Sequence, residues 1–363
     1  MSWAGPMFSF VASGAAPSDY FVIERLAGLS DRQWKSVLSW MLGVAGTRRV
    51  LAEEQYQWIA PCSAFYPERN LPVATPVWPV SYPPSVLEIT SDSNNSSRLR
   101  PDYIAARMQP IGNIEFALVE SKGTSSCLSK MQRCRSAWTK QARNGIVRLN
   151  GSVERISRHL VVATRCNPNG VRERSRRIQV RAWNSRSNDS TSAADQATLL
   201  EVLSAHYFGL CRNLGLHSNL RSLRLAILLR KKSISKLRDK SAQLRDELAQ
   251  LRDELAQLQK EADQEIERRN VSRRPDYRDA DFSIEHDMGA VDIQLAPQAI
   301  MIIRALRSGD EPDKLFGSLS QTLHQLNKWF DEKVRQYQED KDVAVDRSGI
   351  VVNTSRVRVS GDL

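Results

Sequence analysis

The chain has 363 residues, 41% of them hydrophobic, and a formal net charge of +11. This length can hold two domains, and no apolar run approaches the roughly 18 residues that a bilayer crossing requires. The N-terminus lacks the basic start and apolar block of a secretory signal. The five cysteines include no C-x-x-C pair, which disfavours a zinc site and a disulfide framework. We therefore expect a soluble cytoplasmic protein with a polyanionic partner.

The N-terminal part of the chain is predicted to be helical and then extended. Apolar residues recur at helical spacing within residues 18–58, and Ser30 offers a helix cap. Seven prolines between residues 60 and 84 exclude a helix there. We predict one or two amphipathic helices followed by a connector without regular structure.

The next hundred residues alternate between strand and helix patterns. Short apolar runs bounded by polar turns predict strands, and longer runs with apolar residues three or four apart predict helices. In chain order these are strands over 86–90, 102–108 and 114–122, a helix over 128–149, strands over 159–164 and 178–183, and a helix over 194–214.

A coiled coil is predicted over residues 234–266, where the heptad AQLRDEL repeats. In this register Glu247 at position g would meet Arg252 at the following e position of a second copy, which favours a parallel homodimer. The alternative is a hairpin with another helix of the same chain.

The remaining residues carry no recognisable chemistry. Helices are predicted over 297–306 and 315–338, and a strand pair over 343–346 and 350–353. We therefore divide the chain into a domain at 1–220, a coiled coil at 221–270 and a mainly helical region at 271–363. The last region is a possible docking site for a protein partner.

One cluster of polar residues points to chemistry. Residues two apart on a strand project from the same face, so Glu120 and Lys122 are expected side by side with the Ser121 carbonyl between them. Asp102 begins the preceding predicted strand. If the two strands pair, both carboxylates reach one point, and hard divalent cations prefer such oxygen ligands.

The motif Pro101-Asp102 followed by Glu120-Ser121-Lys122 resembles the PD-(D/E)xK family of restriction-endonuclease-like nucleases. The resemblance implies an α/β fold whose α-β-β-β-α-β core is a mixed sheet flanked by helices. It also implies that Asp102, Glu120 and the Ser121 carbonyl hold Mg²⁺ or Mn²⁺. Lys122 would then activate or orient the attacking water, or stabilise charge.

The chain contains a second copy of this residue pattern, which tests whether the pattern alone indicates a site. Pro312-Asp313 precedes Asp331-Glu332-Lys333 with the same spacing of 17 residues between the acids. This copy lies in a predicted helix, where residues two apart diverge by about 200°. Only the first copy can therefore bring its acid and lysine together.

Further site residues are suggested by the family resemblance. On the helix after the catalytic strand the candidates are Lys130, Ser136, Lys140 and Gln141, of which we select Gln141 as the catalytic one. An additional acid from the first helix would be Glu24, Glu53 or Glu54. Each of these side chains could equally be an ordinary solvated residue.

The charge distribution favours nucleic acid as substrate. Residues 130–181 contain fourteen Lys or Arg side chains and only two acids, Glu154 and Glu173, which suits a phosphate backbone better than an ordinary surface. We predict a Mg²⁺-dependent DNA endonuclease of restriction or host defence. The alternatives are a DNA- or partner-binding module with a nuclease fold, and an effector subunit that acts only when a partner docks.

Overall fold

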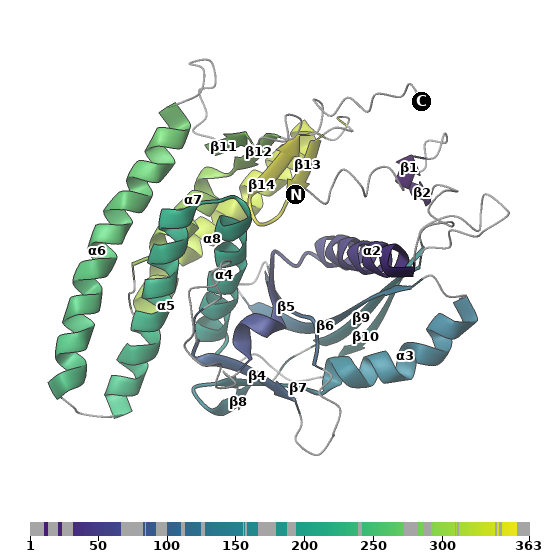
Figure 1. Cartoon of the computed structure of the whole chain (residues 1–363), viewed down its shortest axis with the longest axis horizontal. Helices are drawn as coiled ribbons and strands as arrows, with labels where there is room; N and C mark the ends of the chain where they lie inside the picture. The colour runs from purple at the N-terminus through teal and green to yellow at the C-terminus, as the bar shows by residue number, and fades with distance from the viewer. Residues whose placement is uncertain are drawn as a thin grey trace.

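A computed structural model describes residues 11–13, 21–23, 32–66, 83, 85–91, 100–109, 113–124, 128–154, 156, 158–165, 179–186, 194–238, 242–271, 282–285, 292–308, 310, 312–337, 340 and 343–353. These residues form a mixed α/β structure with a central sheet, flanking helices and a helical layer toward the C-terminus (Figure 1). Within these ranges no helix is both long enough and apolar enough to cross a membrane.

The central sheet has five strands in the order β10-β9-β6-β5-β3. The pair β6–β9 is parallel and the other neighbours are antiparallel. The strands are β3 (Trp58–Pro61), β5 (Tyr103–Met108), β6 (Ile114–Thr124), β9 (Arg158–Arg165) and β10 (Gln179–Arg186).

Two helices cover opposite faces of this sheet, α2 (Arg32–Glu53) on one and α3 (Leu128–Arg143) on the other (Figure 1). The α2 face is apolar at alternate positions of β6, where Ala117 and Val119 pack beside Leu51 of the helix. Alternation then assigns Leu118, Glu120 and Lys122 to the α3 face. The helices predicted near the N-terminus and after the strand that carries Glu120 are thus present.

The first core strand differs from the prediction. Residues 87–91 form β4 (Leu87–Ser91), but β4 pairs with β7 (Gly145–Leu149) in a separate three-stranded sheet that ends with β8 (Ser152–Glu154). The edge of the central sheet is β3 instead, at the junction of the predicted helical segment and the predicted connector. A 3-10 turn at Cys62–Phe65 follows it within the predicted connector. Pro61 fits there because an edge strand tolerates a missing N–H.

The helix predicted over 128–149 was too long. It ends at Arg143, and residues 145–149 form β7 because their apolar side chains pair with β4 and enter the core. The predicted strands at 159–164 and 178–183 correspond to β9 and β10 within a few residues.

The helical layer consists of α4 (Ala194–Asn213), α5 (His217–Arg238), α6 (Ala242–Val271), α7 (Pro297–Leu306) and α8 (Pro312–Gln336). One buried apolar cluster runs from β3, β5 and β6 through α4 to α7 and α8. The core on the α3 side of the sheet is therefore shared with residues far along the chain. The boundaries expected at residues 220 and 270 stay predictions.

The leucine-rich segment forms a hairpin within the chain. Helices α5 and α6 lie side by side (Figure 1), and Leu255 is buried against Leu225 and Leu229 of α5. At the hairpin's base the Arg307 guanidinium donates at 2.7 Å to both Asn219 of α5 and Asp263 of α6. The intrachain hairpin was the alternative to the parallel homodimer in the sequence analysis. The apolar side of α6 that contains Leu255 packs on α5, and a parallel homodimer would require this same side.

Two small antiparallel sheets complete the described structure. One has the order β11-β12-β14-β13 and contains β11 (Phe282–Glu285), β12 (Asp292–Leu295), β13 (Val343–Asp346) and β14 (Ile350–Asn353). The predicted pair at 343–346 and 350–353 is thus confirmed, while β11 and β12 were not predicted. The other pairs β1 (Val11–Ser13) with β2 (Phe21–Ile23).

Candidate functional site

The two acids of the motif lie at neighbouring positions of paired strands. In the β5–β6 ladder Tyr103 is opposite Val119, so Asp102 lies one step further, beside Glu120. The Asp102 N–H donates to the Val119 carbonyl at 2.9 Å, which extends the ladder to the first acid. The structure therefore brings Asp102, Glu120 and Lys122 together.

A backbone hydrogen bond positions the Asp102 carboxylate. Its Oδ2 accepts the N–H of Ser121 at 2.8 Å. Burial raises the pKa of Asp102, and this hydrogen bond and the Lys122 ammonium only partly oppose the rise. The carboxyl group ionises less readily than a free aspartate, because water is excluded from it.

Glu120 is the most enclosed group of the site, with none of its surface exposed. The Lys122 ammonium forms an ion pair with Oε1, while Oε2 has no hydrogen-bond partner among the described residues. Burial, together with the nearby Asp102 charge, raises the pKa of Glu120 to about 8 despite Lys122. A buried oxygen without a partner costs about 1–3 kcal/mol, so this arrangement favours an additional positive ligand.

A hard divalent cation fits these donors. Asp102 and Glu120 offer carboxylate oxygens of the kind Mg²⁺ prefers, and a cation would offset the repulsion that raises the pKa of Glu120. Among the described residues no group of three or more His, Cys, Asp or Glu could hold a metal. Any remaining ligands would be the Ser121 carbonyl, whose role stays a prediction, and water, which Mg²⁺ readily retains.

Helix α2 supports the site from the opposite face of the sheet. The hydroxyls of Thr47 and Ser121 are hydrogen-bonded at 2.8 Å. Next to Lys122, the helix approaches so closely that a Cβ on Gly123 would lie 1.5 Å from the Ser39 carbonyl oxygen. This close contact fixes the strand end that carries Glu120 and Lys122, and the sequence motif did not indicate it.

The structure places Gln141 beside the segment that precedes Asp102, and its proposed catalytic role stays a prediction. Gln141 is 9% exposed and its side-chain amide donates to the Arg100 carbonyl at 3.1 Å. It therefore holds the segment that leads into Asp102. Lys140 and Ser136 are exposed on α3, and the side chain of Lys130 lies outside the described part of the structure.

Neither described acid of the first helix joins the site. Glu54 forms an ion pair with Arg158 at 3.1 Å, on the α2 face of the sheet, opposite to Glu120. Glu53 is exposed and pairs with Arg49 at 2.9 Å. The candidate Glu24 lies outside the described residues. Glu53 at the end of α2 is thus a surface group, and Glu54, which follows the helix, is a structural one.

Three residues beside the acids were not predicted. The Cys62 N–H donates to the Asp102 carbonyl at 2.9 Å, and the Tyr66 hydroxyl donates to the Pro101 carbonyl at 3.4 Å. The Arg100 guanidinium lies 4.3 Å from the centre of the Tyr66 ring. Burial, with the Cys62, Asp102 and Glu120 charges as lesser causes, raises the pKa of Tyr66 to about 12. Cys62 and Tyr66 lie in a proline-rich stretch of the sequence that carries no signal for a site.

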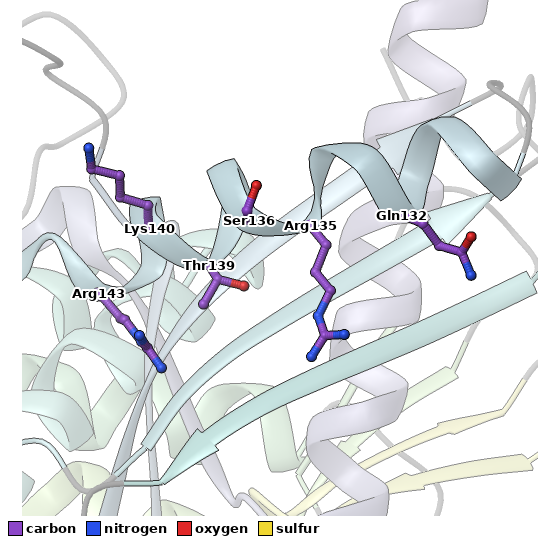
Figure 2. A pocket seen from close by; sticks show the side chains of 6 residues that line it. All are labelled: Gln132, Arg135, Ser136, Thr139, Lys140 and Arg143. Atoms are coloured by element: carbon purple, nitrogen blue, oxygen red, sulfur yellow. The ribbon is translucent and has the colours of Figure 1, made fainter.

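Helix α3, which covers the sheet face that carries Glu120, also presents a basic cavity. The cavity measures about 460 Å³, and its lining has no acid: Gln132, Arg135, Ser136, Thr139, Lys140 and Arg143. Figure 2 shows Arg135, Thr139 and Arg143 pointing to the same side of the helix. Such a surface suits an anionic ligand.

The second copy of the motif cannot form a comparable site. Asp331 and Lys333 lie within α8, where Asp331 is exposed.

Comparison of the chain with protein-family models, with curated proteins and with solved structures finds no match. Function is therefore inferred from the geometry of Asp102, Glu120 and Lys122.

Proposed function

We propose that the chain is a metal-dependent nuclease that hydrolyses phosphodiester bonds of DNA. The observation that carries the proposal is the convergence of Asp102, Glu120 and Lys122, of which Glu120 is fully buried with an unpartnered oxygen. Buried charges of this kind are expensive unless they serve a function. The order α2, β3, β5, β6, α3, β9 also resembles the α-β-β-β-α-β core of the PD-(D/E)xK family.

The roles of the residues follow from phosphodiester chemistry, which requires an attacking water, charge stabilisation and proton transfer. A bound divalent cation supplies Lewis acidity at the phosphate and lowers the pKa of water. Asp102 and Glu120 would hold such a cation with their carboxylates. Lys122, released from its ion pair with Glu120, orients the attacking water or stabilises the negative charge that develops on the phosphate.

DNA is the proposed substrate because of the charge beside the site. Helix α3 contains five Lys or Arg residues and no acid, and β9 and β10 also lack acids. Contacts of this kind bind the phosphate backbone without reading bases. Restriction or host defence is the biological setting that the family resemblance suggests, and a dimer that addresses both DNA strands stays a prediction.

A second candidate function is an effector subunit that a partner activates. Glu120 has no exposed surface and is ion-paired with Lys122, so its carboxylate must become accessible before a cation and a phosphate can reach it. A protein docking on the α5–α6 hairpin or on residues 271–363 could supply this change.

Plasmid cleavage with Mg²⁺ or Mn²⁺ tests the proposal. Wild type should nick or linearise supercoiled DNA, and Glu120→Gln and Lys122→Met should each lower the rate by at least about 100-fold. The matched control is the second motif copy, where Asp331→Asn with Lys333→Met should leave cleavage unchanged. Equal loss in the control and the site variants would contradict the assignment.

The remaining outcomes separate the alternatives. Cleavage that survives both site variants would overturn the proposal. DNA binding without cleavage in any condition would favour the non-catalytic binding module. Cleavage that begins only after a partner protein is added would favour the gated effector.

A further inference from the structure

The edge strand β10 places an aromatic and a basic side chain in line with the proposed site. Through the ladders β6–β9 and β9–β10, Glu120 is opposite Val161, which is opposite Trp183. Lys122, Ala163 and Arg181 form the next row in the same way. Residues that are directly opposite share a face, so Trp183 and Arg181 lie on the α3 face, about 10 Å from the site residues at two strand spacings.

Helix α3 meets this edge with two further side chains of the same chemistry. The Trp138 and Trp183 rings have centroids 6.3 Å apart and are tilted by 45°. The Arg135 guanidinium lies 5.9 Å from the centre of the Trp183 ring. Trp138 and Trp183 are half-buried while Arg135 and Arg181 are exposed, so ring surface and cations reach solvent together.

We refer to these groups and the adjoining cavity as the α3–β10 surface, made of Arg135, Trp138, Arg143, Arg181 and Trp183 with Lys140 at the cavity rim. Figure 2 shows Arg135 and Arg143 on the same side of α3. The surface contains four cations besides its two rings and no acid from α3, β9 or β10.

Aromatic rings interleaved with cations are a combination that unpaired nucleic acid recognises. A base can stack on an aromatic ring only if its own face is free, whereas both faces of a base in a duplex are covered by neighbouring pairs. The cations meanwhile hold the phosphates of the same strand. A purely phosphate-binding face would need no ring.

We propose that the α3–β10 surface binds single-stranded DNA, with a base stacked on Trp183 and phosphates at Arg135, Arg143 and Arg181. This inference rests on the proposed nuclease function for the choice of DNA as ligand. The distance of about 10 Å from Trp183 to Glu120 corresponds to roughly three stacked nucleotides. Unpaired DNA, including the locally unpaired segments that negative supercoiling favours in a plasmid, is therefore the proposed substrate of the site.

The test is fluorescence anisotropy in EDTA, so that binding is measured without cleavage. The probes are a labelled oligothymidylate of about 15 nucleotides and a duplex of the same length. We expect tighter binding of the single strand. Trp183→Ala should weaken it roughly 5- to 150-fold, whereas Trp183→Phe, which keeps a stacking ring, should retain most of the affinity.

One control variant and one replacement test variant separate loss of the binding surface from loss of folding. Trp40 is 67% exposed on α2, on the other side of the sheet, and Trp40→Ala should bind the single strand as wild type does. If Trp183→Ala does not fold, Arg135→Ala at an exposed position serves instead. It should reduce the slope of log affinity against log salt by about 0.7.

The proposal is overturned if the duplex binds more tightly than the single strand, or if folded Trp183→Ala binds as wild type does. Plasmid cleavage decides the nuclease function independently. If the protein cuts DNA but lacks these binding properties, the nuclease proposal stands and the proposal of a single-strand surface fails. If the single strand binds through Trp183 but no DNA is cut, the surface proposal stands and the nuclease proposal fails.

Discussion

Metal affinity at the proposed site should depend steeply on pH, because Glu120 must lose a proton before it can bind a cation. Burial and the Asp102 charge raise the pKa of Glu120 to about 8, whereas a free glutamate has a pKa of about 4.3. Protons therefore compete with the cation. Roughly one molecule in a hundred carries the ionised carboxylate at pH 6, and one in ten at pH 7.

The expected magnitude follows from this fraction. The apparent dissociation constant for Mg²⁺ or Mn²⁺ should fall about tenfold per pH unit between pH 6 and pH 8, or about 1.4 kcal/mol per unit, and level off above pH 8. Binding near pH 7 should release about one proton per cation. Glu120→Gln removes both the charge and the pH dependence.

The metal-free protein should show the opposite trend. Between the unfolded pKa of about 4.3 and the folded pKa of about 8, only the folded state keeps this proton, so the free energy of unfolding falls as the pH rises. The slope from Glu120 is at most about 1.4 kcal/mol per pH unit. Glu120→Gln should lack this contribution and be more stable than wild type at pH 8.

Isothermal titration calorimetry at pH 6, 7, 8 and 9, in buffers of different ionisation enthalpy, measures the affinity and the proton release together. Thermal melts without metal measure the stability trend. Glu332→Gln, at an exposed position of α8, is the matched control and should behave as wild type. Equal metal affinity at pH 6 and pH 8, or metal binding by Glu120→Gln at wild-type affinity, would refute the reasoning.

Two further predictions concern the framework of the site. Gly123→Ala should lower the free energy of unfolding, measured in urea, by about 3 kcal/mol, because a Cβ there would lie 1.5 Å from the Ser39 carbonyl oxygen. The control is Gly209→Ala, which has open space around its Cβ and should stabilise α4 by about 0.5–1 kcal/mol. Unchanged stability of Gly123→Ala would contradict the close packing of α2 on β6. Leu255→Asp should destabilise the α5–α6 hairpin by about 3–5 kcal/mol, and its mass in light scattering should equal that of wild type. Gln257→Asp, at an exposed position of α6, is the control and should change neither quantity. If Leu255→Asp instead dissociates a dimer, the parallel coiled coil is favoured over the hairpin.

Local patterns of the chain predicted much of the site's framework. The alternation of Phe116, Leu118 and Glu120 sets their common face within one strand. Only five residues separate β5 from β6 in the chain, and the Gln109 N–H donates to the Asn113 carbonyl at 2.7 Å, so the pairing of the two strands is local. Asp102 and Glu120 could therefore be brought together from sequence.

Contacts between distant segments could not be predicted in this way. The choice of β3 rather than β4 as a core strand depends on β4 pairing with residues 145–149, which lie more than fifty residues further along the chain, beyond α3. Likewise, whether the leucines of α6 face another copy or α5 of the same chain depends on the packing of Leu255 against α5 and on the hydrogen bonds of Arg307, which the heptad pattern does not encode.

By itself the sequence determined the periodicity of each element, the placement of Glu120 beside Lys122 and the basic character of residues 130–181, because these depend on neighbours in the chain. Only the tertiary structure decided the burial of Glu120, the attachment of Gln141 to Arg100 and the alignment of Trp183 with the site. Burial and alignment arise from packing among strands and helices that meet across long stretches of chain, and it is this packing that raises the pKa of Glu120.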